Sequence, residues 1–148
     1  MTTLAYSKKE NKIAIDGRLT RSDVITNDNA KKWITDSDGV IYFWCGDSDH
    51  PEYLLKQYQT GNKATEMVLN CRLIKASNPP IVIGLDEGEV YTEILDGNFT
   101  CGTGSTWATA ASDFGKNIKD CVKYATTKDI YSGGKIVVYD LIKQRFVK

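Results

Sequence analysis

The chain has 148 residues, of which 41% are hydrophobic and 26% charged, and its 19 basic residues balance its 19 acidic residues. This composition is typical of a globular protein with one core, so we expect a single domain over residues 1–148. The balanced charge argues against a nucleic-acid partner. No apolar run approaches the roughly 20 residues of a membrane-spanning helix, so no membrane partner is expected.

Near the start of the chain, Ile13 and Ile15 alternate with Lys12 and Ala14, which is the pattern of a strand with one buried face. A polar stretch at residues 18–29 is expected to be a long loop. Residues 40–45 are apolar on both faces, which predicts a central strand that is covered on both sides. The expected strands before residue 46 are 3–7 and 12–16, which form a hairpin, an extended piece that begins at 31–34, and 40–45.

The rest of the chain mixes helices and strands. Asp49 and Pro51 are expected to start a helix as its cap and first-turn residue, and Gly61 is expected to end it. Residues 65–76 fit a helix or a strand, and the strand is favoured for 67–74. The further expected elements are a helix at 51–59, a hairpin of 81–85 with 90–95, helices at 106–114 and 118–126, and a closing strand at 135–141.

This order of elements predicts an α+β fold. The apolar central strands need cover on both faces, which two mainly antiparallel sheets packed face to face, with helices outside, would provide. We therefore expect a four-layer αββα sandwich.

The cysteines form no C-x-x-C pair, and the chain has one histidine, His50, next to a proline. A zinc site is therefore not expected, and neither is any other metal or cofactor. Each cysteine lies in or beside an apolar segment, which favours buried reduced thiols and, with no signal-peptide pattern at the start of the chain, a cytoplasmic location. The four are Cys45, Cys71, Cys101 and Cys121.

The start of the chain suggests a catalytic nucleophile. If Met1 is removed, as a small following residue permits, Thr2 acquires a free α-amine. A hydroxyl nucleophile and its own general base then belong to one residue. Taken alone, Met-Thr-Thr is an ordinary N-terminus, so this hypothesis depends on the rest of the chain.

Six short motifs together resemble the proteasome β-subunit and HslV-like peptidase family, the threonine type of N-terminal nucleophile hydrolase. The distance from Asp16 to Lys32 agrees with that of the family, and the resemblance covers nearly the whole chain. The motifs are Thr2-Thr3, Ile15-Asp16-Gly17-Arg18-Leu19-Thr20, Asn29-Ala30-Lys31-Lys32, Cys45-Gly46, Gly102-Thr103-Gly104, and Asp129-Ile130-Tyr131-Ser132-Gly133-Gly134.

The resemblance implies a role for each matched residue. Thr2 would attack a peptide carbonyl while its α-amine takes the proton, and Lys32, oriented by Asp16, would stabilise the alkoxide. The Gly46 amide would be the oxyanion donor. Asp129 and Ser132 would hold the amine and a water, with Thr103 in the matching hydroxyl position. Thr20 would pair with the substrate backbone.

The chain also departs from the family pattern. Ile15 replaces a glycine and Thr103 a serine, changes that keep a strand former and a hydroxyl. The interval from Gly46 to Gly102 is shorter, from which we expect one helix on that side to be shortened or missing. The resemblance implies that Trp44 occupies the position of the family's residue at the base of the first specificity pocket, where an indole would favour small side chains before the scissile bond.

Each motif has a simpler interpretation when taken alone. Asp16-Gly17 can be an ordinary turn, Lys31-Lys32 a solvated charge pair, and Asp129 to Gly134 a helix exit. The segment from Gly102 to Ser105 could suggest a phosphate cradle, but it lacks the P-loop lysine, so nucleotide binding is rejected.

The joint pattern predicts a threonine endopeptidase that acts on peptides or unfolded proteins inside a self-compartmentalised homo-oligomeric ring. The resemblance also suggests an ATP-dependent unfoldase as a partner. Two alternatives stay open: a catalytically inert ring or scaffold protein, and an amidase of the same superfamily that acts on small amides.

Overall fold

The computed structural model describes residues 1–61 and 70–148, and these divide into two compact units. One unit comprises residues 1–32 and 96–148, and the other comprises residues 33–95. Each unit combines one five-stranded antiparallel sheet with helix, and the first also contains a two-stranded hairpin. The expectation of two antiparallel sheets in a mixed fold is thus confirmed.

The sheet of the first unit has the order β10-β1-β2-β11-β12. Its first hairpin is confirmed, and the register of the two strands places Leu4 opposite Ile15. Two elements were not foreseen, β10 and β12. The bounds are β1 Thr3–Ser7, β2 Lys12–Ile15, β10 Phe99–Gly102, β11 Val137–Asp140 and β12 Arg145–Phe146.

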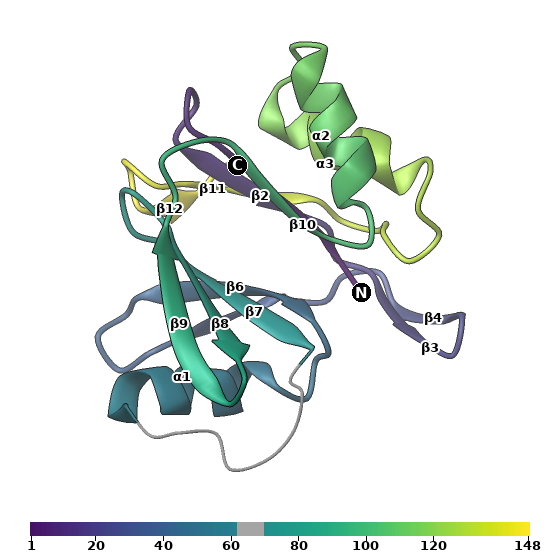
Figure 1. Cartoon of the computed structure of the whole chain (residues 1–148). Coiled ribbons are helices and arrows are strands. Elements are labelled where there is room, and N and C mark those ends of the chain that lie inside the picture. The colour runs from purple at the N-terminus through teal and green to yellow at the C-terminus, as the bar shows by residue number, and fades with distance from the viewer. Residues whose placement is uncertain (62–69) are drawn as a thin grey trace. The chain divides into compact units, whose positions relative to one another are not determined.

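Helices α2 (Ser105–Asp113) and α3 (Ile118–Thr126) cover one face of this sheet (Figure 1). Both were expected, and α3 has the expected bounds. The side chains between helices and sheet are mostly small, which lets the helices approach the strands closely. They are Ala5, Ala14, Ala108, Ala111, Ile118, Cys121, Val122, Ala125 and Val138.

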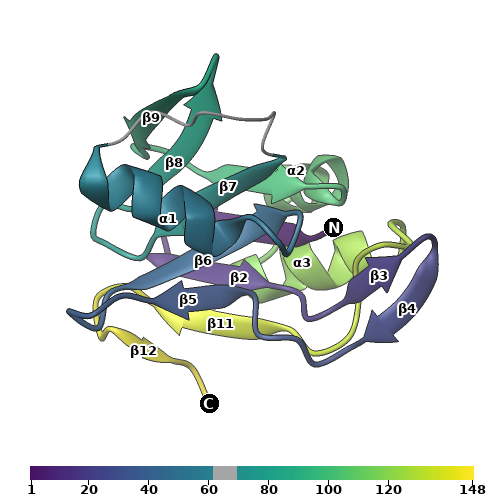
Figure 2. The ribbon, with the colours of Figure 1, turned by 90° about the horizontal axis from the view of Figure 1, so that it is seen from below.

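The expected long loop at residues 18–29 is wrong in part, because it contains the hairpin of β3 (Leu19–Arg21) and β4 (Val24–Asn27). Figure 2 shows this hairpin beyond the end of β2. The turn residues Ser22 and Asp23 both have positive φ, at 46° and 65°. The Asn-Gly or Asp-Gly signal of such a turn is missing here, which explains why the pattern did not reveal it.

The second unit is a sheet with its strands in chain order, β5-β6-β7-β8-β9. The buried strand and the following hairpin were both expected. The bounds are β5 Trp33–Thr35, β6 Ile41–Gly46, β7 Cys71–Lys75, β8 Ile81–Asp86 and β9 Glu89–Ile94. The expected strand at 67–74 is confirmed from Cys71 onward, while its start lies outside the described residues.

Helix α1 (Pro51–Thr60) packs on β7 and β8 (Figure 1). Pro51 is in its first turn and Gly61 ends it in a left-handed conformation, as expected. The cap prediction is wrong: the N-cap is His50, and its side chain makes no capping bond. One helix is described between Gly46 and Gly102. Residues 62–69 of this interval lie outside the described residues, so the expectation of a shortened or missing second helix stays a prediction.

The expectation of buried free thiols is confirmed for Cys71 and Cys121. Burial raises the pKa of the Cys71 thiol to about 12, so it is an unreactive core side chain. The expectation is wrong for Cys45 and Cys101, which are disulfide-bonded. Among residues 1–61 and 70–148, no helix is long and apolar enough to cross a membrane.

Candidate functional site

The first hairpin brings the start of the chain to Asp16. Because Leu4 pairs with Ile15, the next positions outward, Thr3 and Asp16, also lie opposite each other. The Asp16 amide donates to the Thr3 carbonyl at 3.2 Å, and the Thr3 amide donates to Asp16 Oδ1 at 2.9 Å. The register of β1 and β2 therefore fixes the carboxylate beside the backbone of the two threonines.

Lys32 and Asp16 form a fully buried ion pair, with Nζ 2.9 Å from Oδ1 and no exposed side-chain surface on either residue. Asp16 accepts four hydrogen bonds: Oδ1 from Lys32 and the Thr3 amide, and Oδ2 from the amides of Gly133 and Arg18. Four donors match the capacity of a carboxylate. A buried charge with this many partners is held in one orientation.

Burial lowers the pKa of the Lys32 ammonium group below its ordinary value, and the charge and hydrogen bond of Asp16 oppose this shift. The more distant charge of Asp129 also favours the protonated lysine. Desolvation disfavours the charged form of any lysine, whereas a carboxylate in contact restores it. Lys32 is therefore a cation whose proton is held less tightly than that of a surface lysine.

The ion pair flanks Thr2 on both sides along the backbone. Lys32 Nζ donates to the Met1 carbonyl at 2.9 Å, which belongs to the peptide group before Thr2, while Asp16 binds the amide of the peptide group after it. Thr2 is fully buried, and its Oγ1 has no hydrogen-bond partner within the described parts of the chain. Such an unpaired buried hydroxyl is unusual and indicates an atom whose partner comes from elsewhere.

A second polar cluster lies on the other side of the threonine pair. Asp129 Oδ2 accepts hydrogen bonds from Ser132 Oγ and Thr103 Oγ1, both at 2.6 Å. Asp129 Oδ1 accepts from the Tyr131 amide at 3.1 Å. Ser132 Oγ is also 2.6 Å from Thr3 Oγ1. The structure thus brings together the three residues expected to hold the amine and links them to Thr3, which was not expected.

The Gly-Thr-Gly segment after β10 leaves room for both threonines at the start of β1. A Cβ on Gly102 would lie 1.8 Å from the Thr2 carbonyl oxygen, and Gly102 has a φ of +96°. A Cβ on Gly104 would lie 1.9 Å from Thr3 Oγ1. The glycines are therefore required by close approach and not by a phosphate, which is the physical reason to reject the nucleotide interpretation.

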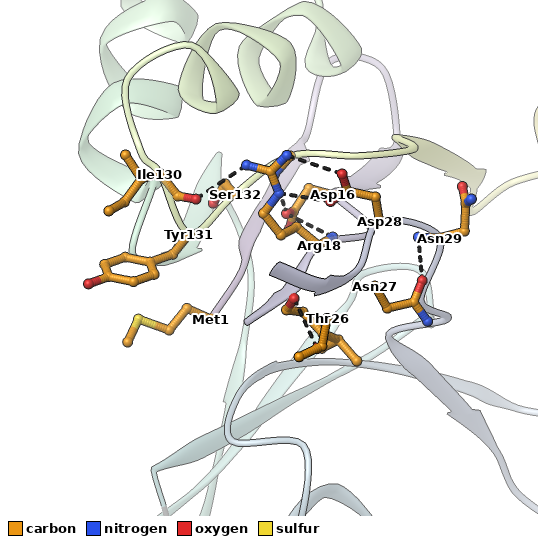
Figure 3. A network of polar contacts seen from close by, with 12 residues as sticks. Met1, Asp16, Arg18, Thr26, Asn27, Asp28, Asn29, Ile130, Tyr131 and Ser132 are labelled. Atoms are coloured by element: carbon orange, nitrogen blue, oxygen red, sulfur yellow. Dashed lines mark hydrogen bonds and ion pairs between the residues drawn. The ribbon is translucent and has the colours of Figure 1, made fainter. Parts of the chain in front are cut away.

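Arg18 joins the segments that carry the two clusters (Figure 3). Its guanidinium forms a two-point ion pair with Asp28, at 2.8 and 3.2 Å, and also donates to the Ile130 carbonyl at 3.3 Å. The hydrogen bond with Arg18 holds the pKa of the Asp28 carboxyl below its usual range. The hydrogen bond from Arg18 to the Ile130 carbonyl connects the segment after the first hairpin to the loop that contains Asp129 and Ser132.

A pocket of about 370 Å³ opens beside the second cluster. Asp129 is part of its wall, together with the β3–β4 hairpin residues Asp23 and Ile25 and with Tyr131. A larger pocket, of about 440 Å³, lies between α2 and α3 and contains none of the expected site residues. The pocket of about 370 Å³ therefore borders the polar site at Asp129.

Three expected residues are not members of the two hydrogen-bonded clusters described above. Thr20 is on β3, opposite Ile25, and is half-buried. Gly46 and Trp44 are on β6 in the other compact unit, where Trp44 is 5% exposed and Gly46 has a φ of +106°. Their roles in oxyanion binding and substrate selection stay predictions.

The described residues contain no group of three or more His, Cys, Asp or Glu side chains placed to hold a metal ion. What they provide is a hydroxyl, a buried ammonium–carboxylate pair and a carboxylate that accepts two hydroxyl groups. These groups can activate a nucleophile and stabilise negative charge on it.

Sequence reasoning missed Thr3 and Arg18 as members of the site. Thr3 was counted only as part of a motif, although adjacent strand residues point to opposite faces and so cannot share one partner set. The glycine at position 104 was a usable signal, because a glycine across from a strand residue often marks a close approach. Arg18 was missed because it stands at a variable position of the motif Ile15-Asp16-Gly17-Arg18-Leu19-Thr20.

Comparison with known proteins supports the fold. No family model and no curated protein sequence matches the chain. Among solved structures, the crystal structure of eukaryotic HslV from Trypanosoma brucei matches with a TM-score of 0.69. The match covers 93% of this chain and 97% of the HslV chain, at 20% sequence identity. The chain therefore has an HslV-like fold.

Proposed function

We propose that this chain is a threonine-type peptidase that uses Thr2 as its N-terminal nucleophile once Met1 is removed. One observation carries the proposal: the buried Lys32–Asp16 pair flanks Thr2, whose own Oγ1 is buried and unpaired within the described residues. The HslV-like fold supports a hydrolase of the proteasome type.

The mechanism follows from these contacts. With Met1 gone, the Lys32 ammonium group loses the Met1 carbonyl that accepts its hydrogen bond, and it is free to interact with the Thr2 hydroxyl. The neutral α-amine of Thr2 takes the hydroxyl proton as Oγ1 attacks the carbonyl carbon of the substrate. The positive charge of Lys32, kept by Asp16, stabilises the oxygen while it carries negative charge.

The tetrahedral intermediate then collapses to an ester on Thr2. The peptide C–N bond breaks, and the leaving nitrogen takes the proton that the α-amine carried. Water attacks the ester with the amine as base, which releases the acid and restores Thr2. The cluster of Asp129, Ser132 and Thr103 would orient the amine and this water. The Gly46 amide would bind the oxyanion, typically worth about 2.7–4 kcal/mol.

The finer expectations belong to the same proposal. The two sheets would form the inner layers of a four-layer αββα sandwich, and the chain would assemble into a homo-oligomeric ring that encloses its nucleophiles. Unfolded protein or peptide would be the substrate, delivered by an ATP-dependent unfoldase in the cytoplasm. Thr20 would bind the substrate backbone. The likeness to an HslV structure is the support for these points.

Hydrolysis of a fluorogenic peptide panel and of a matched set of small amides tests the activity. The variant Thr2→Ala keeps a small second residue, so Met1 removal is unaffected while the hydroxyl is lost. We expect the wild type to cleave peptides, Thr2→Ser to retain part of the rate, and Thr2→Ala to be inactive. Cleavage of small amides alone would favour the amidase, and equal inactivity of all three would favour the inert ring.

A further inference from the structure

Thr3 touches both polar clusters of the site. Through its backbone it exchanges hydrogen bonds with Asp16, and through its side chain it contacts Ser132. It is fully buried. Thr3 therefore links the Lys32–Asp16 pair to the Asp129 cluster through its own backbone and side chain.

The direction of the hydroxyl chain follows from a count of protons. Ser132 has one hydroxyl proton, which it donates to Asp129 Oδ2 at 2.6 Å, because a carboxylate oxygen only accepts. The 2.6 Å contact between Ser132 and Thr3 therefore requires Thr3 Oγ1 to be the donor. The chain of hydrogen bonds runs from Thr3 to Ser132 to Asp129, and Asp129 accepts a second hydrogen bond from Thr103.

The fold makes space for this particular side chain. A Cβ at position 104 would lie 1.9 Å from Thr3 Oγ1, so the glycine there leaves room for the Thr3 hydroxyl. A hydroxyl at this place, held by one strand, fixes the Ser132 side chain from a loop more than a hundred residues later in the chain.

We propose that Thr3 is a positioning residue for the peptidase reaction, and this inference rests on the function proposed above. Its hydroxyl sets the rotamer of Ser132, and its backbone sets the position of Asp16 relative to Thr2. Without the Thr3 proton, Ser132 can rotate away from the geometry in which it and Asp129 hold the α-amine. Misplaced reacting groups reduce the rate of the chemical step more than they reduce substrate binding.

The test compares Thr3→Val, which replaces the hydroxyl by a methyl group of similar shape, with Thr3→Ser, which keeps the hydroxyl. We expect kcat of Thr3→Val to fall about 10- to 100-fold with KM little changed. Thr3→Ser should restore most of the rate. Assays are run well below the unfolding midpoint of each variant, so that a loss of folded protein is not read as a loss of rate.

Two further variants separate positioning from general stability. Thr109→Val removes an exposed hydroxyl that is 2.7 Å from Thr100 Oγ1, a similar hydroxyl pair outside the site, and should keep the full rate. The double variant Thr3→Val/Ser132→Ala should be no slower than the slower single variant, because both changes break the same chain.

The outcomes distinguish the two proposals. If Thr2→Ala is inactive while Thr3→Val has the wild-type kcat, Thr3 has no positioning role and the peptidase proposal stands. If Thr3→Ser is as slow as Thr3→Val, or if the effects of Thr3→Val and Ser132→Ala multiply fully, the hydroxyl chain is refuted. If Thr2→Ala is as active as the wild type, the function proposed above fails and the Thr3 inference fails with it.

Discussion

Replacing Lys32 with methionine breaks the buried ion pair and leaves Asp16 without its counter-charge. Both side chains are fully buried, and the loss of one partner of such a pair typically costs about 3–5 kcal/mol. Three backbone amides, those of Thr3, Arg18 and Gly133, still donate to Asp16. We therefore expect a loss near the lower limit, about 3 kcal/mol, which lowers the Tm by about 6–12 °C in a chain of this size.

The assay is urea unfolding followed by tryptophan fluorescence, with calorimetry for the Tm. Lys31→Met is the matched control, because Lys31 is adjacent and exposed, and its loss should change the free energy of unfolding by less than about 0.5 kcal/mol. The double variant Lys32→Met/Asp16→Asn should cost less than the sum of its single variants. Equal stability of Lys32→Met and Lys31→Met, or full additivity in the double variant, would refute a coupled buried pair.

Three further predictions concern other parts of the molecule. Gly102→Ala should lose activity and more than about 1 kcal/mol of stability, because Gly102 has a positive φ and lies close to the Thr2 carbonyl. The control Gly39→Ala, at a glycine with φ +81° but open space around it, should keep activity. Equal activity of the two variants would contradict the close-approach argument. Trp44→Leu should admit bulkier side chains before the scissile bond in a substrate library, and a wild-type preference for aromatic residues there would sink the idea. Burial, and then a hydrogen bond to a carboxylate, raise the pKa of Tyr42 from 10.0 to about 12, so the stabilisation it contributes is present below pH 10 and lost as the pH rises toward 12. Across that range the free energy of unfolding should fall more steeply with pH for the wild type than for Tyr42→Phe, and an equal slope for both would refute this prediction.

Much of the fold could be predicted because local patterns and tertiary structure agree. In β2, Ile13 and Ile15 alternate with Lys12 and Ala14 in the sequence. Helix α3 begins after Asn117, whose side chain accepts a hydrogen bond from the Asp120 amide as a helix cap. The β3–β4 hairpin could not be predicted, since all four β4 residues are exposed and its turn lacks glycine. An exposed hairpin carries no periodic apolar signal.

Other misses have equally local causes. Residues 99–102 form β10, which the glycines of the following segment concealed, because glycine weakens a strand pattern. Asp49 is an ordinary capping residue, but helix α1 starts one position too late for it, after His50. The disulfide state of Cys45 and Cys101 could not be predicted from the sequence, because neither cysteine belongs to a recognisable motif.

The polar site was predictable to the extent that it depends on motifs. Asp16, Lys32, Asp129, Ser132 and Thr103 were identified by the resemblance, and the structure brings them into two hydrogen-bonded clusters. What motifs cannot specify is which atom contacts which, and that is why Thr3 was missed. A contact through a hydroxyl depends on strand register and on the space left by Gly104, both of which are tertiary properties.

Intact mass spectrometry before and after treatment with a peptide epoxyketone tests the central claim most directly. This reagent forms a stable ring only with a residue that offers both a hydroxyl and a free α-amine. The account predicts a protein that lacks Met1 and gains one inhibitor mass, with no adduct on Thr2→Ala. Retention of Met1, or loss of Met1 with no adduct on the wild type, would contradict Thr2 as an activated N-terminal nucleophile.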